Sequence, residues 1–155
     1  MSHKINLHVM VNGIPVDAPD QDLQVARGYD QWADKGAVLD GKRVTILTEK
    51  TEYALNEEIR VVHVLEVLEP GRAIYVMGPK VVFDEYVDGD LQRKPLSEWG
   101  GDPFLPNVYN GRVQDSPGLD FNFEITSYHF SKPGSHRIWW QPGRWKSNIL
   151  TIIVG

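Results

Sequence analysis

Cysteine is absent from the 155-residue chain. Its absence excludes disulfides, thiolate metal sites, a cysteine nucleophile and a blue-copper centre. It also agrees with a reducing compartment. Packing and backbone hydrogen bonds must therefore hold the core. The length predicts a single domain over 1–155, large enough to bury a substantial core.

Long hydrophobic runs are also missing. The longest apolar stretch, Ile149–Val154, is short and is interrupted by Thr151, so we expect no membrane-spanning segment. The first residues, Met1–Asn6, do not combine a basic segment with a following apolar one, and no secretory signal is visible. A cytoplasmic location is the expectation that follows.

Positive charge is scarce and scattered. The 16 lysines and arginines are outnumbered by 21 aspartates and glutamates, which gives a net charge of −5. Proteins that bind phosphates usually gather lysine and arginine on one surface, and the sequence shows no such gathering. Nucleic acid is therefore not an expected partner.

The motifs of common catalytic sites are absent as well. The chain has no Gly-x-Ser-x-Gly elbow, no glycine-rich phosphate loop and no Gly-x-Gly-x-x-Gly after a predicted strand. Carboxylates could still pair as acid and base, but a sequence does not show their separation. An enzyme is accordingly less expected than a binding or structural module, and no cofactor is predicted.

The chain does contain short β-favouring runs separated by turn residues. In its last third, the runs Phe121–Phe130, His136–Gln141 and Asn148–Val154 are separated by Ser131–Gly134 and by Pro142–Gly143. Such spacing predicts an antiparallel β-sandwich or barrel.

Further strands are predicted nearer the N-terminus. Ile5–Val11 and Ile14–Val16 flank the turn signal Asn12–Gly13, which predicts a hairpin. Arg43–Thr48 has the composition of a strand.

The longest predicted strand is Glu58–Leu68. Both of its faces are largely apolar, which indicates that both are covered and that the strand lies in the middle of a layered structure. After the turn residues Glu69–Arg72, Ala73–Met77 is expected to return as its hairpin partner.

Two segments differ from the rest. Residues 18–37 are polar and lack a clean helical stripe, and Gly28 weakens a helix further, so we expect a surface excursion with one helical turn. Residues 88–120 are rich in proline and glycine and predict a long irregular loop. Loops of this length are often functional, and apolar residues such as Phe104 would anchor it.

Two groups of residues follow a recurrent pattern. The first is Leu47–Lys50, Tyr53, Asn56–Glu57 and Ile59–Val61, and the second is Phe130, Pro133–Gly134, His136–Ile138, Ser147–Asn148 and Ile149–Val154. The first group resembles the entry to a common strand in bacterial immunoglobulin-like and macroglobulin-like domains, and the second is similar to their closing hairpin. The resemblance implies an immunoglobulin-like β-sandwich. It transfers no catalytic residue, because such sandwiches host unrelated activities.

Aromatic residues are the main candidates for a binding surface. Trp139 and Trp140 are neighbours on a predicted strand, so their side chains point to opposite faces. One is expected in the core, and the other is exposed, covered by the long loop or buried at an interface. Tryptophan, tyrosine and arginine together are typical of recognition surfaces. The predicted binding residues are Trp99, Tyr109, Arg137, Trp139, Trp140, Arg144 and Trp145.

This surface has alternative ligands. We expect a protein partner, which includes a second copy of the chain, to bind through the exposed aromatic residue and the long loop. Carbohydrate is the alternative, because the same rings could stack on sugar rings.

His129 and His136 are candidate metal ligands. A hairpin that turns about residues 132–134 would place them almost opposite each other on antiparallel strands, close enough to share a metal. Zinc needs at least a third ligand, for which His63, Glu124 or a loop aspartate are candidates. A hydrogen-bonded histidine pair is the alternative.

An acidic cluster surrounds the next turn signal. Asp84, Glu85, Asp88 and Asp90 could offer oxygen ligands to Ca²⁺, but they lack the ligand order of an EF-hand. We expect them to form a solvated acidic turn.

Overall fold

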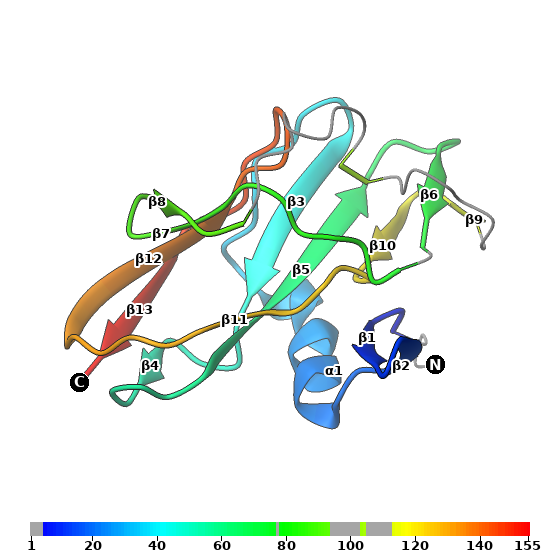
Figure 1. Cartoon of the computed structure of the whole chain (residues 1–155). Coiled ribbons are helices and arrows are strands. Elements are labelled where there is room, and N and C mark those ends of the chain that lie inside the picture. The colour runs from blue at the N-terminus through cyan, green and yellow to red at the C-terminus, as the bar shows by residue number, and fades with distance from the viewer. Residues whose placement is uncertain (1–4, 77, 94–102, 105–112) are drawn as a thin grey trace.

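The computed structural model describes residues 5–76, 78–93, 103–104 and 113–155 (Figure 1). The described chain consists mainly of β-strands, with one short α-helix and one 3-10 turn, which confirms the all-β prediction. In chain order the elements are β1 (His8–Val11), β2 (Ile14–Asp17), α1 (Asp20–Arg27), η1 (Tyr29–Gln31), β3 (Lys42–Leu47), β4 (Glu52–Tyr53), β5 (Ile59–Val67), β6 (Ala73–Tyr75), β7 (Glu85–Val87), β8 (Asp90–Leu91), β9 (Val113–Asp115), β10 (Gly118–Asp120), β11 (Thr126–Tyr128), β12 (Gly134–Trp140) and β13 (Leu150–Val154).

The first main sheet is built around β5. β3 lies along one edge of β5 in antiparallel register, from Lys42 opposite Val67 to Leu47 opposite Val62. β10 and β11 follow one another along the other edge, each antiparallel to β5. Both edges of β5 are therefore occupied.

The second main sheet has the order β4-β13-β12-β7-β8. Its pairs are antiparallel except for the short parallel contact between β13 and β4. β12 is its longest strand, and it pairs with β13 over Gly134–Ile138 and with β7 over Ile138–Trp140.

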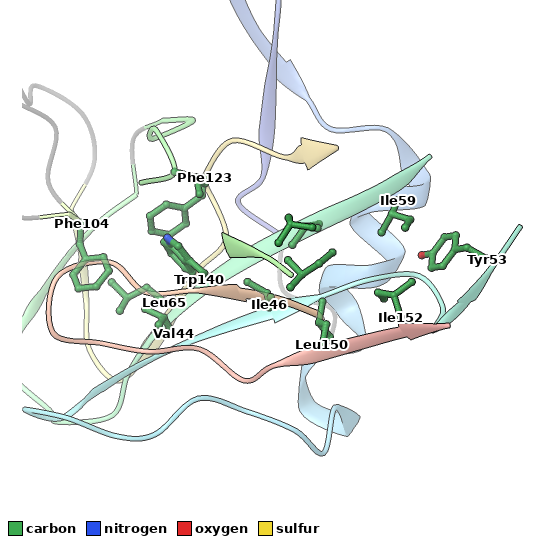
Figure 2. Close-up of a cluster of buried hydrophobic side chains, with 14 of the residues drawn as sticks. Val44, Ile46, Tyr53, Ile59, Leu65, Phe104, Phe123, Trp140, Leu150 and Ile152 are labelled. Atoms are coloured by element: carbon green, nitrogen blue, oxygen red, sulfur yellow. The ribbon is translucent and has the colours of Figure 1, made fainter. Parts of the chain in front are cut away.

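The two main sheets enclose one hydrophobic core. Inward side chains recur at every second residue of a strand, and those of β5 meet those of β12 and β13. Trp140 is the largest fully buried side chain, and its ring lies edge-to-face with Phe123 at 5.1 Å between centroids. Figure 2 shows these two rings close together, with Tyr53, Ile59 and Ile152 at the other end of the cluster.

The opposite face of β5 is also buried. This confirms the prediction that both faces of this strand are covered, which was based on apolar residues at both odd and even positions. Val62 and Val64 are fully buried in a second cluster, with residues of α1, of η1 and of the segments that flank the β1–β2 hairpin. The hairpin itself has the predicted turn, with Asn12 at φ 51° and Gly13 at φ 78°. Figure 1 shows α1 and the hairpin away from β12 and β13. The molecule thus has three layers.

The expectation of a surface excursion over residues 18–37 is wrong. α1 has eight residues and buries Ala26, and η1 buries Tyr29. The buried stripe begins at Asp22, whose carboxylate accepts hydrogen bonds from Arg60 of β5, with 2.8 Å between Nη2 and Oδ2 and 3.0 Å between Nε and Oδ1. A stripe that begins with an acid and continues with a small residue gives no apolar signal in the sequence.

The expected partner of β5 is also wrong. β6, from the predicted strand Ala73–Met77, pairs with β9 in a separate two-stranded sheet. The reason is that segments distant in sequence already occupy both edges of β5.

The long loop predicted over residues 88–120 contains strands. β8, β9 and β10 lie within it, and Phe104 is a buried anchor in the main core. Residues 94–102 and 105–112 of this segment lie outside the described residues.

Candidate functional site

β12 separates the two neighbouring tryptophans as predicted. Trp140 points into the core and is 1% exposed, whereas Trp139 is half-buried on the other face of the strand. Arg137 lies two residues before Trp139 and therefore on the same outer face. The candidate site is this outer face of the five-stranded sheet.

An aromatic stack lies at the centre of the outer face. Tyr86 of β7 is directly opposite Trp139 in the register, and their rings are stacked with 5.3 Å between centroids and 9° between planes. The Lys146 ammonium lies 5.6 Å from the Trp139 ring centroid. Leu91 of β8 pairs with Tyr86 and continues the row toward the edge of the sheet.

Aliphatic and basic side chains extend this face along β12 and β13. Arg137 pairs with Thr151, and Ser135 pairs with Ile153. Leu91 is 42% exposed. Ile153 is 46% exposed, although the inward residues of its strand, β13, are buried. The Arg137 guanidinium makes no ion pair with any residue that the structure describes.

The two main sheets differ in how their outer faces are covered. α1, η1 and the N-terminal hairpin lie over the β5 sheet and bury its outer valines. Within the described chain, the outer face of the β12 sheet keeps its large apolar side chains partly open to solvent. An apolar and aromatic sheet face that stays partly open to solvent on a folded protein indicates an interaction surface.

Other predicted binding residues lie elsewhere. Trp145 is half-buried, lies 5.1 Å from the Phe104 ring and donates from Nε1 to the Leu39 carbonyl at 2.9 Å. Arg144 lies over the Trp145 ring at 5.5 Å and forms an ion pair with Asp40. These two residues therefore make local structural contacts.

The remaining predicted residues do not contribute to this outer face. Trp140 belongs to the core, and Trp99 and Tyr109 lie outside the described residues. The sequence prediction missed Tyr86, Leu91 and Lys146. If β7 is recognised as a strand, Val87 faces the core and its neighbour Tyr86 must face outward, so Tyr86 could have been predicted. No local sequence signal indicates that Lys146 reaches the Trp139 ring.

The predicted cross-strand register of His129 and His136 is wrong. β12 pairs with β13 and β7, so His136 lies opposite Ile152, while the strand that precedes His129 pairs with β5. The chain crosses from one sheet to the other at the turn, and this crossing separates the two strands. Among the described residues, no group of three or more His, Cys, Asp or Glu side chains could hold a metal ion.

His136 has structural partners instead. Its Nδ1 lies 2.6 Å from Oδ2 of Asp88, its Nε2 lies 2.9 Å from the Lys132 carbonyl oxygen, and its ring stacks on Phe130. The hydrogen bond to Asp88 raises the pKa of His136, and burial opposes this effect. Asp88 also accepts a hydrogen bond from the Arg137 backbone N–H at 2.9 Å, so this group fixes the start of β12.

The expected acidic turn is only partly solvated. Asp88 and Asp90 are exposed, but Glu85 is fully buried between the sheets. Its Oε2 lies 2.5 Å from Nε2 of His63, and Tyr128 donates a hydrogen bond to its other oxygen. Burial alone raises the pKa of Glu85, but His63 and the hydrogen bonds more than offset burial and hold the pKa below its ordinary value. Because His63 and Glu85 are sealed from solvent, this network links strands and offers no access to a substrate.

No family model, curated protein or solved structure matches the chain. Among the described residues, no helix is long and apolar enough to cross a membrane. The outer face of the five-stranded sheet is therefore the feature of this protein that points to a function.

Proposed function

We propose that this protein is a non-enzymatic binding module that engages a protein partner through the outer face of its β12 sheet. The observation that carries the proposal is the half-buried Tyr86–Trp139 stack, flanked by exposed aliphatic side chains on a sheet face that no described element covers. Tryptophan, tyrosine and arginine supply most of the strongly contributing residues at protein interfaces.

The charges on this face favour an acidic partner. Arg137 has no ion-pair partner among the described residues, and Lys146 lies over the Trp139 ring without a described carboxylate partner. The whole chain has a net charge of −5, but these two side chains make this part of the surface locally positive. A partner that presents aspartate or glutamate beside an apolar segment would complement both the ring stack and the two cations. A second copy of this acidic chain is one such partner.

Carbohydrate binding has weaker support. Tyr86 and Lys146 already contact the Trp139 ring, at 5.3 Å and 5.6 Å from its centroid. A sugar ring that stacked on Trp139 would compete with these contacts. A protein partner can instead pack over the whole stack and its aliphatic border.

The decisive variant removes the stack. We expect the double substitution Tyr86→Ser with Trp139→Ser to weaken capture of a partner about 30-fold, because interface residues of this type commonly contribute about 2 kcal/mol or more. The measurement is quantitative affinity capture from cells that express the protein, followed by titration of the recovered partner against purified wild type and variant.

A matched control lies on the opposite layer. Met10→Ser also removes an exposed apolar side chain, from the β1–β2 hairpin, and should leave capture unchanged. Glycan-array binding and sedimentation of the purified chain test the sugar and self-association alternatives. If the double variant and the wild type are both folded and capture the partner equally well, the outer face is not the binding surface.

A further inference from the structure

The β1–β2 hairpin gathers exposed apolar side chains on one of its faces. Val9 pairs with Val16, and Val11 pairs with Ile14. These four residues share a face, because partners across two strands and every second residue along a strand point to the same side, whereas Met10 lies on the other face. Val9 is half-buried against the second cluster, but the other three are exposed. Ile14 is 63% exposed, the highest value among the large hydrophobic residues that the structure describes.

The hairpin and the outer face of the β12 sheet lie on opposite sides of the molecule. Figure 1 shows β1 and β2 at one side and β12 and β13 at the other. The hairpin belongs to the layer over the β5 sheet, and the main core lies between that sheet and the inner face of the β12 sheet. The hairpin of one chain therefore does not reach the outer face of the same chain, and contact between these two surfaces requires two copies.

The two surfaces carry opposite charges beside their apolar side chains. Asp17 ends β2, its side chain is 72% exposed, and its one ion-pair partner among the described residues is His8, at 3.5 Å. Asp20 begins α1, is exposed, and makes no ion pair with a residue that the structure describes. The outer face presents Arg137 and Lys146, which also lack a described carboxylate partner. Such complementarity favours contact between the two surfaces.

The two surfaces also agree in size. Each hairpin strand has four residues and is about 13 Å long, because a residue advances about 3.3 Å along a strand. The row that runs from Leu91 of β8 through Tyr86 and Trp139 to β13 crosses four strands, which lie about 4.8 Å apart, so the row is about 14 Å wide. A hairpin laid along this row crosses the strands of the sheet nearly at right angles, which is one of the two ways in which sheets pack.

We propose that the β1–β2 hairpin of one copy docks on the outer face of the β12 sheet of the next copy. This inference rests on the proposed function, since it uses the same outer face and identifies the partner as a second copy of the chain. Val11, Ile14 and Val16 pack on the ring stack and its aliphatic border, and the two aspartates face the two cations. A contact between two outer faces would instead bring like charges together.

This contact joins two different surfaces, so it does not close on itself in a pair. Each added copy leaves a free hairpin at one end of the assembly and a free outer face at the other. Contacts of this head-to-tail kind build rings or open chains. We therefore expect assemblies larger than a dimer.

Mixing two complementary variants tests the contact. Val11→Ser with Ile14→Ser removes the hairpin surface, and Tyr86→Ser with Trp139→Ser removes the receiving surface. In sedimentation velocity at low ionic strength, the wild type should form species larger than a dimer as its concentration rises. Each double variant alone should need about a 30-fold higher concentration to associate. An equal mixture should stop at a dimer, because one intact hairpin and one intact outer face are then left to combine.

Two further variants separate the apolar and the charged parts of the contact. Met10→Ser is the matched control, because Met10 is exposed on the other face of the same hairpin, and this variant should assemble like the wild type. Asp17→Asn with Asp20→Asn should weaken assembly about 5-fold at low ionic strength, as two surface ion pairs contribute about 1 kcal/mol together. The assembly of this variant should also depend less on salt.

Three results overturn the inference. They are a wild type that stays monomeric at every concentration, a wild type that stops at a dimer, and a mixture of the two double variants that stays monomeric although each unfolds cooperatively in urea. The proposed function is judged separately. A monomeric wild type that captures a different protein through the Tyr86–Trp139 stack keeps the proposed function and removes the head-to-tail contact alone.

Discussion

At the scale of single residues, Asn148 completes the edge of β3 that no described strand covers. Among the residues that the structure describes, β3 pairs with a strand only on its β5 side. On the other side, Oδ1 of Asn148 accepts from the Ile46 N–H at 2.8 Å, and its Nδ2 donates to the Ile46 carbonyl at 3.0 Å. One buried side-chain amide therefore makes the two hydrogen bonds that a neighbouring strand would make.

Asn148→Ala should destabilise the protein strongly. It leaves a buried N–H and a buried C=O of Ile46 without partners, and each such group costs about 1–3 kcal/mol, so we expect a loss of about 3 kcal/mol in the free energy of unfolding. Urea denaturation at neutral pH measures this loss. Thr151→Ala, on the exposed face of β13, is the control and should change the free energy by less than about 0.5 kcal/mol. A loss for Asn148→Ala as small as that of the control would contradict the assigned role.

At the scale of elements, a polar link joins three strands across the core. Glu85 of β7 contacts His63 of β5 and accepts a hydrogen bond from Tyr128 of β11. Since β7 belongs to one main sheet and β5 and β11 to the other, the link fixes the position of one sheet on the other. The His63 ring also lies edge-to-face with Trp140, so the link continues into the apolar core.

The link predicts a pH-dependent contribution to stability. Because the folded-state pKa of Glu85 lies below its ordinary value, the ionised carboxylate stabilises the fold above about pH 4.5. This contribution is lost as the pH falls through the folded-state pKa. At neutral pH we expect Glu85→Gln to lower the free energy of unfolding by about 2 kcal/mol, because a buried charge-assisted hydrogen bond is replaced by a neutral one.

The informative quantity is the difference between wild type and Glu85→Gln, measured by urea denaturation from neutral pH downward. The difference should shrink below about pH 4.5 as the wild-type carboxyl becomes protonated. Glu52→Gln, on an exposed edge strand, should show little difference at any pH. A gap between wild type and Glu85→Gln that stays constant with pH would refute the contribution of the Glu85 charge.

Strands could be predicted from the sequence, but most of their partners could not. Alternation and turn residues are local signals, so the β1–β2 hairpin, β5 and the opposite orientations of Trp139 and Trp140 were predictable. Pairing depends on segments distant in sequence. β5 takes β10 and β11 as neighbours, and the chain changes sheets before β12, which moves His136 away from the predicted register with His129.

The same limit applies to the candidate site. Local alternation predicts Trp139 and Arg137 on one face, but Tyr86 reaches Trp139 only through the pairing of β7 with β12. The buried partners Glu85 and His63 are 22 residues apart, and each is an ordinary polar residue in the sequence. Polar groups buried as pairs carry no hydrophobic signal, and this is why an acidic turn was expected where one carboxylate is sealed in the core.

At the scale of the whole molecule, the N-terminal layer distinguishes the two sheet faces. It covers the outer face of the β5 sheet, whereas no described element covers the outer face of the β12 sheet. Leu47, Val62 and Val64 are all 0% exposed beneath this layer. Burying each such side chain contributes about 1.5–3 kcal/mol. Together they approach the total stability of a typical domain, which is about 5–15 kcal/mol.

Removal of residues 1–35, which include β1, β2, α1 and η1, should therefore abolish the stable fold. We expect the shortened chain to be insoluble or to bind an apolar dye, and to lose a cooperative urea transition. The control is full-length protein with Met10→Ser and Ile14→Ser, since both side chains are exposed on the hairpin and should be dispensable for folding. A shortened chain that stays soluble and unfolds cooperatively near the full-length midpoint would show that the layer is the surface excursion its polar sequence suggests. In that case the β5 face, newly bare, would have to be considered as a second binding surface.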